Sequence, residues 1–358
     1  MRMITTEIIQ QTLAKFGAML LVGFLGTDHG NNDIRRIEDH IGSGKVGGVL
    51  LLHRNIQEGP KKLKNLIHQF KMKAPADRPL LVAIDGEGGV VKRLMKEDGY
   101  DIQLPSAKKL AQMSTADSDK LLQVYMKQLS DLGINWNLAP VVDVEVATET
   151  GCIGRLERSF SKSPKKVAYH GYQLIQAIQE AGMAFCLKHW PGLGADVGDT
   201  HKGMTNLTNV WSRERDAEPF NLIVKEISKN RPNKTIPVMT AHSVHEGLDS
   251  GAPSLTFSEQ VIEGQRKKWQ AEVLFVSDDL DMGALDGFEL GEKVVRAILA
   301  GNDVLIFSQY RNYDPEKVDK IYQSLQQALE KNDKQAEMLI KRINESFNRI
   351  EKFKADYL

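Results

Sequence analysis

The stretch EVLFVSDD (272–279) indicates how this chain folds, because it is a short apolar run that ends in charged residues. A run of this length, bounded by polar groups, is typical of a strand buried on both faces of a parallel sheet. Including this stretch, we count eight such runs: AMLLVGF (18–24), VGGVLLL (46–52), LLVAID (80–85), INWNLAP (134–140), AFCLKHW (184–190), TIPVMTA (235–241), EVLFVSDD (272–279) and DVLIFS (303–308). The sequence therefore predicts eight buried strands.

Amphipathic segments lie between these runs, among them residues 60–73, 119–133 and 164–182. The last two segments end in Gly133 and Gly182, which are typical residues for a helix C-terminus. Eight strand–helix units over this length predict an α/β fold of the (β/α)8 TIM type.

No Pro/Gly/Ser-rich linker divides the chain, so we expect a single domain with a C-terminal helical extension. Residues 1–313 would form the catalytic barrel. Residues 314–358 would form C-terminal helices packed on its outside, with KNDKQAE (331–337) as the turn between two helices.

The composition argues against several classes of protein. The 358 residues include 47 Lys plus Arg and 47 Asp plus Glu, and this zero net charge does not suit a nucleic-acid partner. No apolar run approaches the ~20 residues that cross a bilayer, so we expect no membrane role. The N-terminal segment is too polar for the core of a signal peptide, which favours a cytoplasmic protein. Cys152 and Cys186 each lie beside apolar residues and are expected to be buried thiols.

Polar and charged residues follow six successive strands. They are HRN with Arg54, DGEGGVVKR, VVDV with the following loop to RLERSF, KHWPGLGADVGDTH (188–201), AHSVHEG and SDDLDMG. The C-terminal face of a TIM barrel, where these residues would meet, carries the active site in essentially every characterised enzyme of this fold. The pattern therefore favours an enzyme over a binding or scaffold protein.

The loop 188–201 and the end of the seventh strand carry the candidate catalytic groups. In an extended loop Asp199 and His201 would point the same way, so the carboxylate would orient the imidazole for proton transfer. A casual surface Asp–His pair is the alternative. Asp278 at the end of a buried strand is a candidate nucleophile or base, and glycosidases need two such groups flanking one bond.

The same loop and strand ends also contain residues that could form a cofactor site or a metal site. The spacing of Gly192, Gly194 and Gly198 differs from the dinucleotide motif, so we expect no cofactor. A metal hydrolase is kept as an alternative, because five groups could converge at the barrel mouth: His189, Asp199, His201, His242 and Asp278. No HExxH or paired CxxC occurs, and Lys188 would repel a cation, so we expect no metal.

Taken together, these motifs resemble glycoside hydrolase family 3, specifically its single-domain β-N-acetylhexosaminidases. The resemblance rests on KHWPGLGADVGDTH, DGEGGVVKR, APVVDV, ERSFSKSP, MTAH, SDDLDMGA and AGNDVLI, which occur in order between about residues 20 and 310. The family implies that Asp278 is the nucleophile and that His201, held by Asp199, is the general acid/base. Asp279 would support the nucleophile rather than react. The implied sugar-binding residues are Asp85, Arg93, Arg158, Lys188 and His189.

The sequence departs from the family pattern at three places. Val90 stands where Arg is usual, Leu193 stands where His is common, and GRLERSF is two residues longer than usual. Arg155 therefore competes with Arg158 for the sugar contact.

The resemblance implies a retaining enzyme that releases terminal N-acetyl-β-D-glucosamine, in the cytoplasm, from fragments of the cell wall. A phosphorylase or a β-glucosidase of the same family is the alternative within the fold. A catalytically inactive protein that binds amino sugars is the alternative from another class. A carbohydrate is the expected partner, and we expect a monomer or a weak homo-oligomer.

Overall fold

The computed structural model describes residues 4–196, 198–200, 202–331 and 333–358. Eight strands form one sheet in the order β4-β3-β2-β1-β10-β9-β7-β5, and all hydrogen-bonded neighbours in it are parallel. Their bounds are β1 Leu20–Gly23, β2 Gly48–Leu51, β3 Leu81–Ile84, β4 Trp136–Asn137, β5 Leu187–Trp190, β7 Ile236–Thr240, β9 Val273–Asp279 and β10 Val304–Phe307. Each strand lies within one of the eight predicted runs.

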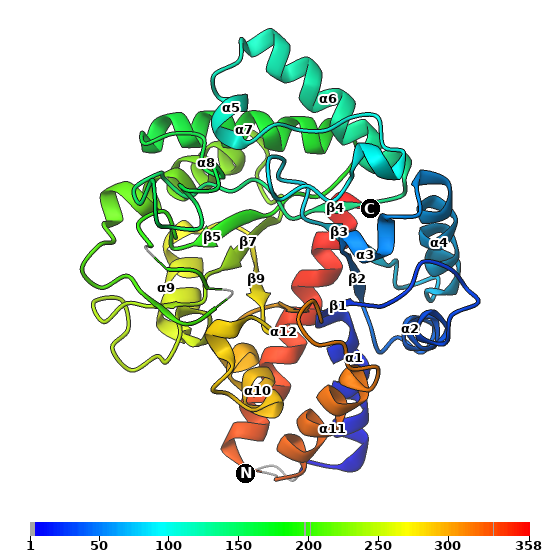
Figure 1. Ribbon diagram of the computed structural model, residues 1–358. Coiled ribbons are helices and arrows are strands. Elements are labelled where there is room, and N and C mark those ends of the chain that lie inside the picture. The colour runs from blue at the N-terminus through cyan, green and yellow to red at the C-terminus, as the bar shows by residue number, and fades with distance from the viewer. Residues whose placement is uncertain (1–3, 197, 201, 332) are drawn as a thin grey trace.

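The two ends of the sheet are joined, which closes the barrel. Isolated parallel bridges pair Trp136 with Ala184 and Val141 with Lys188. The main-chain amide of Cys186 also donates to the carbonyl of Ala139 over 2.9 Å. Helices surround the strands (Figure 1), and the TIM-type fold predicted from the sequence is confirmed.

Twelve α-helices are assigned among the described residues. They are α1 Thr6–Phe16, α2 Asn32–Gly42, α3 His53–Ile56, α4 Pro60–Lys73, α5 Ala107–Leu110, α6 Thr115–Asp131, α7 Pro164–Glu180, α8 Glu218–Asn230, α9 Glu259–Trp269, α10 Leu290–Ala300, α11 Lys317–Glu330 and α12 Lys334–Tyr357. Gly133 and Gly182 have φ angles of +95° and +76° just past the ends of α6 and α7. Glycine adopts this left-handed conformation without steric cost, so both helices end where the sequence predicts.

Shorter elements lie in the loops. They are the 3₁₀ turns η1 Gly17–Met19, η2 Lys96–Asp98, η4 Leu255–Phe257 and η5 Gly283–Leu285, and the π turn η3 Arg213–Ala217. The strands β6 Thr205–Asn206 and β8 Ser243–Val244 pair in parallel as a small second sheet, which the sequence did not predict. Among the described residues no helix has both the length and the apolar character needed to cross a bilayer.

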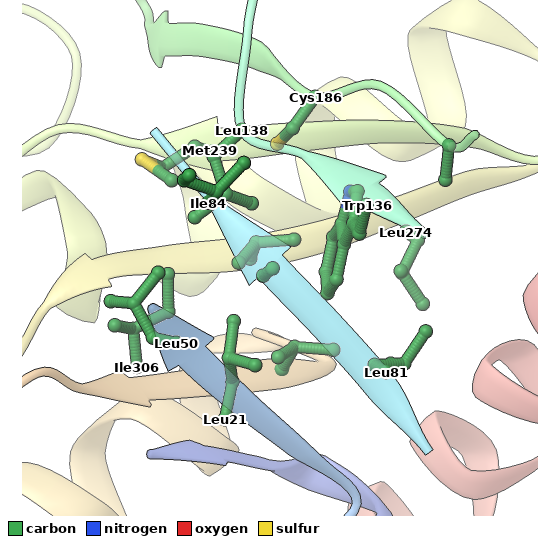
Figure 2. Close-up of a cluster of buried hydrophobic side chains, with 14 of the residues drawn as sticks. Leu21, Leu50, Leu81, Ile84, Trp136, Leu138, Cys186, Met239, Leu274 and Ile306 are labelled. Atoms are coloured by element: carbon green, nitrogen blue, oxygen red, sulfur yellow. The ribbon is translucent and has the colours of Figure 1, made fainter. Parts of the chain in front are cut away.

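Apolar side chains fill the inside of the barrel (Figure 2). Leu21, Leu50, Ile84 and Leu274 come from four different strands, and each is at most 3% exposed. Full burial of a side chain of this size contributes about 1.5–3 kcal/mol to stability. Cys186 is buried in the same cluster as a free thiol, as predicted, and this burial raises its pKa above the ordinary value.

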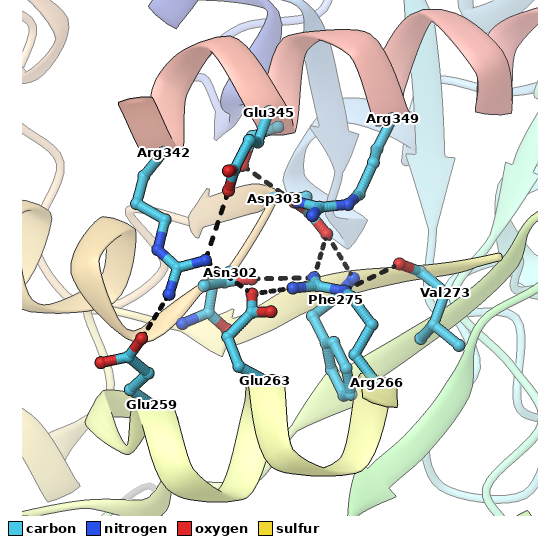
Figure 3. A network of polar contacts seen from close by, with 12 residues as sticks. Glu259, Glu263, Arg266, Val273, Phe275, Asn302, Asp303, Arg342, Glu345 and Arg349 are labelled. Carbon is cyan, nitrogen blue, oxygen red and sulfur yellow. Dashed lines mark hydrogen bonds and ion pairs between the residues drawn. The ribbon is translucent and has the colours of Figure 1, made fainter. Parts of the chain in front are cut away.

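The last helix, α12, packs against α1, α10 and α11. Its Phe353 ring lies 5.0 Å from the ring of Trp136 in β4. A network of ion pairs ties α12 to α9 and to the start of β10 (Figure 3). In it the buried carboxylate of Asp303 contacts Arg266 of α9 at 2.6 Å and Arg349 of α12 at 2.9 Å. The network therefore joins elements far apart in the sequence.

Candidate active site

A pocket of about 310 Å³ opens at the C-terminal ends of the barrel strands. Apolar side chains such as Leu50, Met239 and Ile306 form part of its lining. Six of the residues predicted from the sequence line this one pocket: Asp85, Arg93, Arg158, Lys188, His189 and Asp278. The fold therefore brings together groups contributed by the ends of β3, β5 and β9 and by the loop after β4.

Five charged residues of alternating sign form a continuous chain along the pocket. Arg93 Nη2 lies 2.9 Å from Asp85 Oδ2, and Lys188 Nζ lies 2.8 Å from Asp85 Oδ1. Lys188 Nζ is also 2.6 Å from Glu87 Oε1. Glu87 then accepts two bonds from Arg158, from Nε at 2.8 Å and from Nη2 at 2.9 Å. This geometry fixes the direction of each donor and acceptor.

The pairing keeps Asp85, Glu87 and Lys188 ionised, although burial opposes the charged form of each. Burial by itself raises the pKa of Glu87, but the charges of Arg158 and Lys188 outweigh it and lower that pKa to about 2. Burial likewise opposes ionisation of Asp85, yet Lys188 and Arg93 hold its pKa well below the ordinary value. For Lys188, burial lowers the pKa, and the two carboxylates reverse the effect and raise it. The pocket thus offers fixed charged donors and acceptors to a polar ligand.

His189 follows Lys188 across a cis peptide bond, and its ring is held by a buried carboxylate. Its Nδ1 lies 2.8 Å from Asp143 Oδ2. The other oxygen of Asp143 accepts bonds from the main-chain amides of His189 at 3.3 Å and of Leu193 at 2.7 Å. Because a carboxylate accepts, Nδ1 is the donor. Asp143 therefore sets both the orientation of His189 and the start of the loop that follows β5.

The two adjacent aspartates at the end of β9 have different surroundings, although both line the pocket. One carboxylate oxygen of Asp278 accepts from the main-chain amide of Asp279 at 2.8 Å. The carboxylate of Asp279 instead accepts from both the main-chain amide and the hydroxyl of Ser308 in the neighbouring strand segment. Burial, with a smaller effect from the charge of Asp281, raises the pKa of Asp279 to about 7.

His242, which the sequence offered as a possible metal ligand, lies behind the pocket and does not line it. Its Nε2 is 2.9 Å from the main-chain oxygen of Asp279, and its Nδ1 is 2.8 Å from Thr256 Oγ1. Burial lowers the pKa of His242. In the part of the chain that the structure describes, no three His, Cys, Asp or Glu residues are placed to hold a metal ion.

The loop after β5 carries the predicted proton-transfer pair. His201 lies outside the described residues, and so does its predicted pairing with Asp199. Asp199 does not line the pocket, whereas the neighbouring Thr200 does. The carbonyl of Asp199 accepts bonds from the amides of Lys202 at 2.8 Å and Gly203 at 3.2 Å. The extended arrangement expected of Asp199 and His201 includes a residue outside the described part of the chain, so it stays a prediction.

Arg155 and Arg158, the two candidates after β4 for the sugar contact, have different surroundings in the structure. Arg158 lines the pocket and pairs with Glu87, whereas Arg155 is exposed and lies in a separate hollow. Arg54, which the sequence placed with the polar residues at the strand ends, is not in the pocket lining. It donates to the main-chain oxygens of Phe24, Ser308 and Gln309, so it braces neighbouring loops.

Sequence reasoning missed two buried residues of the site, Glu87 and Asp143. Both stood inside motifs that had been recognised, Glu87 in DGEGG and Asp143 in APVVDV. The available signal was an acidic residue just after an apolar run, which a buried site tolerates only when it is paired. Their partners come from other strands, so the sequence could not supply the pairing.

Comparison with known proteins identifies the family of this chain. Residues 11–353 match the family model described as the glycosyl hydrolase family 3 N terminal domain. A protein of Photobacterium profundum named Beta-hexosaminidase is 30% identical over 78% of this chain and 79% of that protein. Beta-hexosaminidase A of Pseudoalteromonas piscicida is 28% identical over 86% of this chain, and the match spans only 53% of that protein's length.

Solved structures show the same fold. A β-N-acetylhexosaminidase from Beutenbergia cavernae superposes with a TM-score of 0.81 at 22% identity, covering 97% of this chain and 98% of that one. A glycoside hydrolase family 3 β-N-acetylglucosaminidase from Paenibacillus gives a TM-score of 0.78 at 27% identity, covering 94% of this chain and 62% of that one. The barrel, its polar pocket and these matches define a glycoside hydrolase. The chain belongs to glycosyl hydrolase family 3.

Proposed function

We propose that this protein is a retaining β-N-acetylglucosaminidase that releases terminal N-acetyl-β-D-glucosamine from the non-reducing end of a glycoside. The observation that carries the proposal is that Asp278 shares one small pocket with the charged chain from Arg93 to Arg158. The names of the relatives support the choice of sugar.

The charged chain suits one sugar ring. Lys188 and Arg158 present N–H donors, and Asp85 presents acceptor oxygens, so hydroxyl groups can bond to either kind of partner. A volume of about 310 Å³ is at the lower end of ligand pockets, which favours a single ring over a long oligosaccharide. Because the charged groups already hold one another in place, little side-chain ordering would accompany binding.

The proposed reaction has two displacements. In the first, an oxygen of Asp278 bonds to the anomeric carbon while the bond to the leaving oxygen breaks, and His201 gives that oxygen its proton. In the second, His201 takes a proton from water, the water oxygen bonds to the anomeric carbon, and Asp278 leaves. Asp199 would orient the imidazole. An imidazole suits both roles because its ordinary pKa, about 6.5, lies near neutrality.

The test is release of p-nitrophenol from its N-acetyl-β-D-glucosaminide and from its β-D-glucoside, each with and without inorganic phosphate. We expect selective cleavage of the first substrate, with free N-acetylglucosamine as the product. Preference for the glucoside would overturn the choice of sugar, and formation of a sugar 1-phosphate would overturn hydrolysis. Folded protein that binds N-acetylglucosamine but cleaves neither substrate would be a binding protein.

We further propose fragments of the cell wall as natural substrates and the cytoplasm as the site of action. The support is the resemblance of the sequence motifs to the single-domain members of the family. Incubation with purified muropeptides, followed by mass spectrometry, should show loss of one N-acetylglucosamine. Cell fractionation should recover the protein with cytoplasmic markers, and recovery outside the cytoplasm would contradict the second proposal.

A further inference from the structure

A second hollow, of about 510 Å³, lies beside the catalytic pocket. The two share Val90 and Leu156 in their linings, so they meet at a common rim. Val90 is 62% exposed, so solvent reaches this shared rim. A ligand held in the pocket can therefore extend into this hollow.

The lining of the hollow is cationic, although the chain as a whole has no net charge. Lys92, Lys109 and Arg155 line it, with Glu157 as the acidic member. Within the described part of the chain, none of these three cations takes part in an ion pair that the structure records. The neighbouring Lys108, outside the lining, does pair with an acid, Glu145, at 3.2 Å. The three cations are thus available to an external anion.

The walls of the hollow are tied to each other. The hydroxyl of Ser106 donates to Glu157 Oε2 at 2.7 Å, which engages the acidic group of the hollow. The main-chain amide of Lys108 donates to the carbonyl of Glu157 at 3.3 Å, and the amide of Gly89 donates to the carbonyl of Leu104 at 3.0 Å. The segments after β3 and after β4 therefore form one preformed wall, and binding need not order them first.

We propose that this hollow binds the aglycone of the substrate and selects an aglycone that carries carboxylates. The inference rests on the proposed function, because it assigns the catalytic pocket to the sugar. The part of the substrate beyond the scissile bond must leave through the pocket mouth, and Val90 and Leu156 place the cationic hollow there. Unpaired cations in a concave site raise the local concentration of an anionic ligand.

The test uses two aryl N-acetyl-β-D-glucosaminides with the same phenol and a para-propionyl tail, coupled in one to glutamate α-amide and in the other to glutamine α-amide, so that only the first carries a carboxylate. The leaving group is identical, so a difference in kcat/KM reports on the tail charge alone. We expect the wild-type protein to prefer the glutamate substrate and to lose this preference at high salt, because exposed charges are screened.

Charge-reversal variants test which residues cause the preference for the glutamate substrate. K109E and R155E should each reduce the glutamate-to-glutamine ratio by up to about fivefold, and the double variant by about tenfold, the size expected for exposed charge pairs. The effect is read from this ratio, because cleavage of the neutral glutamine substrate reports any effect of the substitutions that does not depend on the charge of the tail. The matched control K64E reverses an exposed lysine on α4, outside the hollow, and should leave the ratio unchanged.

Binding of the same two glycosides to D278N, measured by calorimetry, separates this inference from the proposed function. Cleavage of both substrates without a charge preference would contradict the proposed role of the hollow and would leave the proposed function unaffected. Tighter binding of the glutamate glycoside, abolished by K109E/R155E, supports the hollow even if the wild-type protein cleaves neither. Binding that does not discriminate between the tails overturns the inference whatever the activity.

Discussion

The Nε2 atom of His242 donates to the main-chain oxygen of Asp279 over 2.9 Å. A carbonyl oxygen only accepts, so Nε2 carries the proton. Burial lowers the pKa of His242, and in the neutral ring Nδ1 then accepts from the hydroxyl of Thr256. A buried, neutral imidazole therefore holds the end of β9, which is the segment that carries Asp278.

Replacing His242 should impair catalysis more than substrate binding. In H242F the oxygen of Asp279 loses its donor, and a shift of Asp278 by a fraction of an ångström should lower kcat about 10–100-fold with little change in KM. The free energy of unfolding should fall by about 1–3 kcal/mol. H242Q, whose amide can still donate, should recover part of kcat. A wild-type kcat in H242F would show that this contact does not position the nucleophile.

Replacing the proposed nucleophile should abolish turnover without unfolding the protein. D278N should lower kcat at least about 10³-fold, because its amide cannot form the glycosyl ester. D286N is the matched control, since Asp286 is exposed and pairs with Arg311 at 2.8 Å. It should cleave p-nitrophenyl N-acetyl-β-D-glucosaminide at the normal rate. A 2-fluoro sugar should label Asp278, and a label on Asp279 would move the nucleophile by one residue.

Neutralising Glu87 should destabilise the fold. Its side chain is 6% exposed and faces both Lys188 and Arg158, so E87Q leaves two buried cations with less compensation. We expect a loss of about 3–5 kcal/mol in the free energy of unfolding, measured in urea. E58Q removes the acid of the exposed pair with Lys62 and should leave the free energy of unfolding nearly unchanged, because water screens exposed charges. Equal losses in the two variants would contradict the role of burial.

The same carboxylate should make stability depend on pH. The pKa of Glu87 falls from 4.5 to about 2 on folding, so between these values the unfolded chain binds more protons than the native protein. The stabilisation is fully present above pH 4.5 and is lost as the pH falls towards 2. Urea titrations at several pH values in this window should give a shallower pH dependence for E87Q than for the wild type. Parallel curves would show that Glu87 is not stabilised by its partners.

The network around Asp303 should contribute to stability but not to catalysis. Asp303 is fully buried and accepts from Arg266, Arg349 and Ser346. D303N should lower the free energy of unfolding by about 3 kcal/mol, because Arg349 loses its ion-pair partner and Arg266 keeps only Glu263. At a temperature where the variant is folded, kcat/KM should match the wild type. A change in KM with unchanged stability would place the network in contact with the site.

The strands were predictable because their burial is local information. A strand covered on both faces is apolar throughout, so each run in the sequence marks one strand. The exact bounds were less predictable. The run 134–140 contains only the two-residue strand β4, and Pro140 has no amide to give to a longer ladder. The short helices α3 and α5 and the β6–β8 sheet have too few residues for a period to show.

The residue types of the site were predictable, but their pairing was not. Asp85, Lys188 and Asp278 could be assigned because they follow apolar runs in motifs that resemble a family. The place of Glu87 between Lys188 and Arg158 depends on three segments of the chain meeting in space. Arg54 stands at a strand end as the others do, yet carbonyl oxygens of neighbouring loops hold it outside the pocket lining.

The pairing of β1 with β10, through Leu20 and Leu305, has a consequence for how the protein reaches its folded state. This seam joins the first strand of the barrel to the last, so almost the whole sequence must be synthesised before it can form. Contacts between such distant residues require a large loop closure, which slows folding. Until then β1 is an open edge available to another chain, and the nascent protein should depend on chaperones to avoid aggregation.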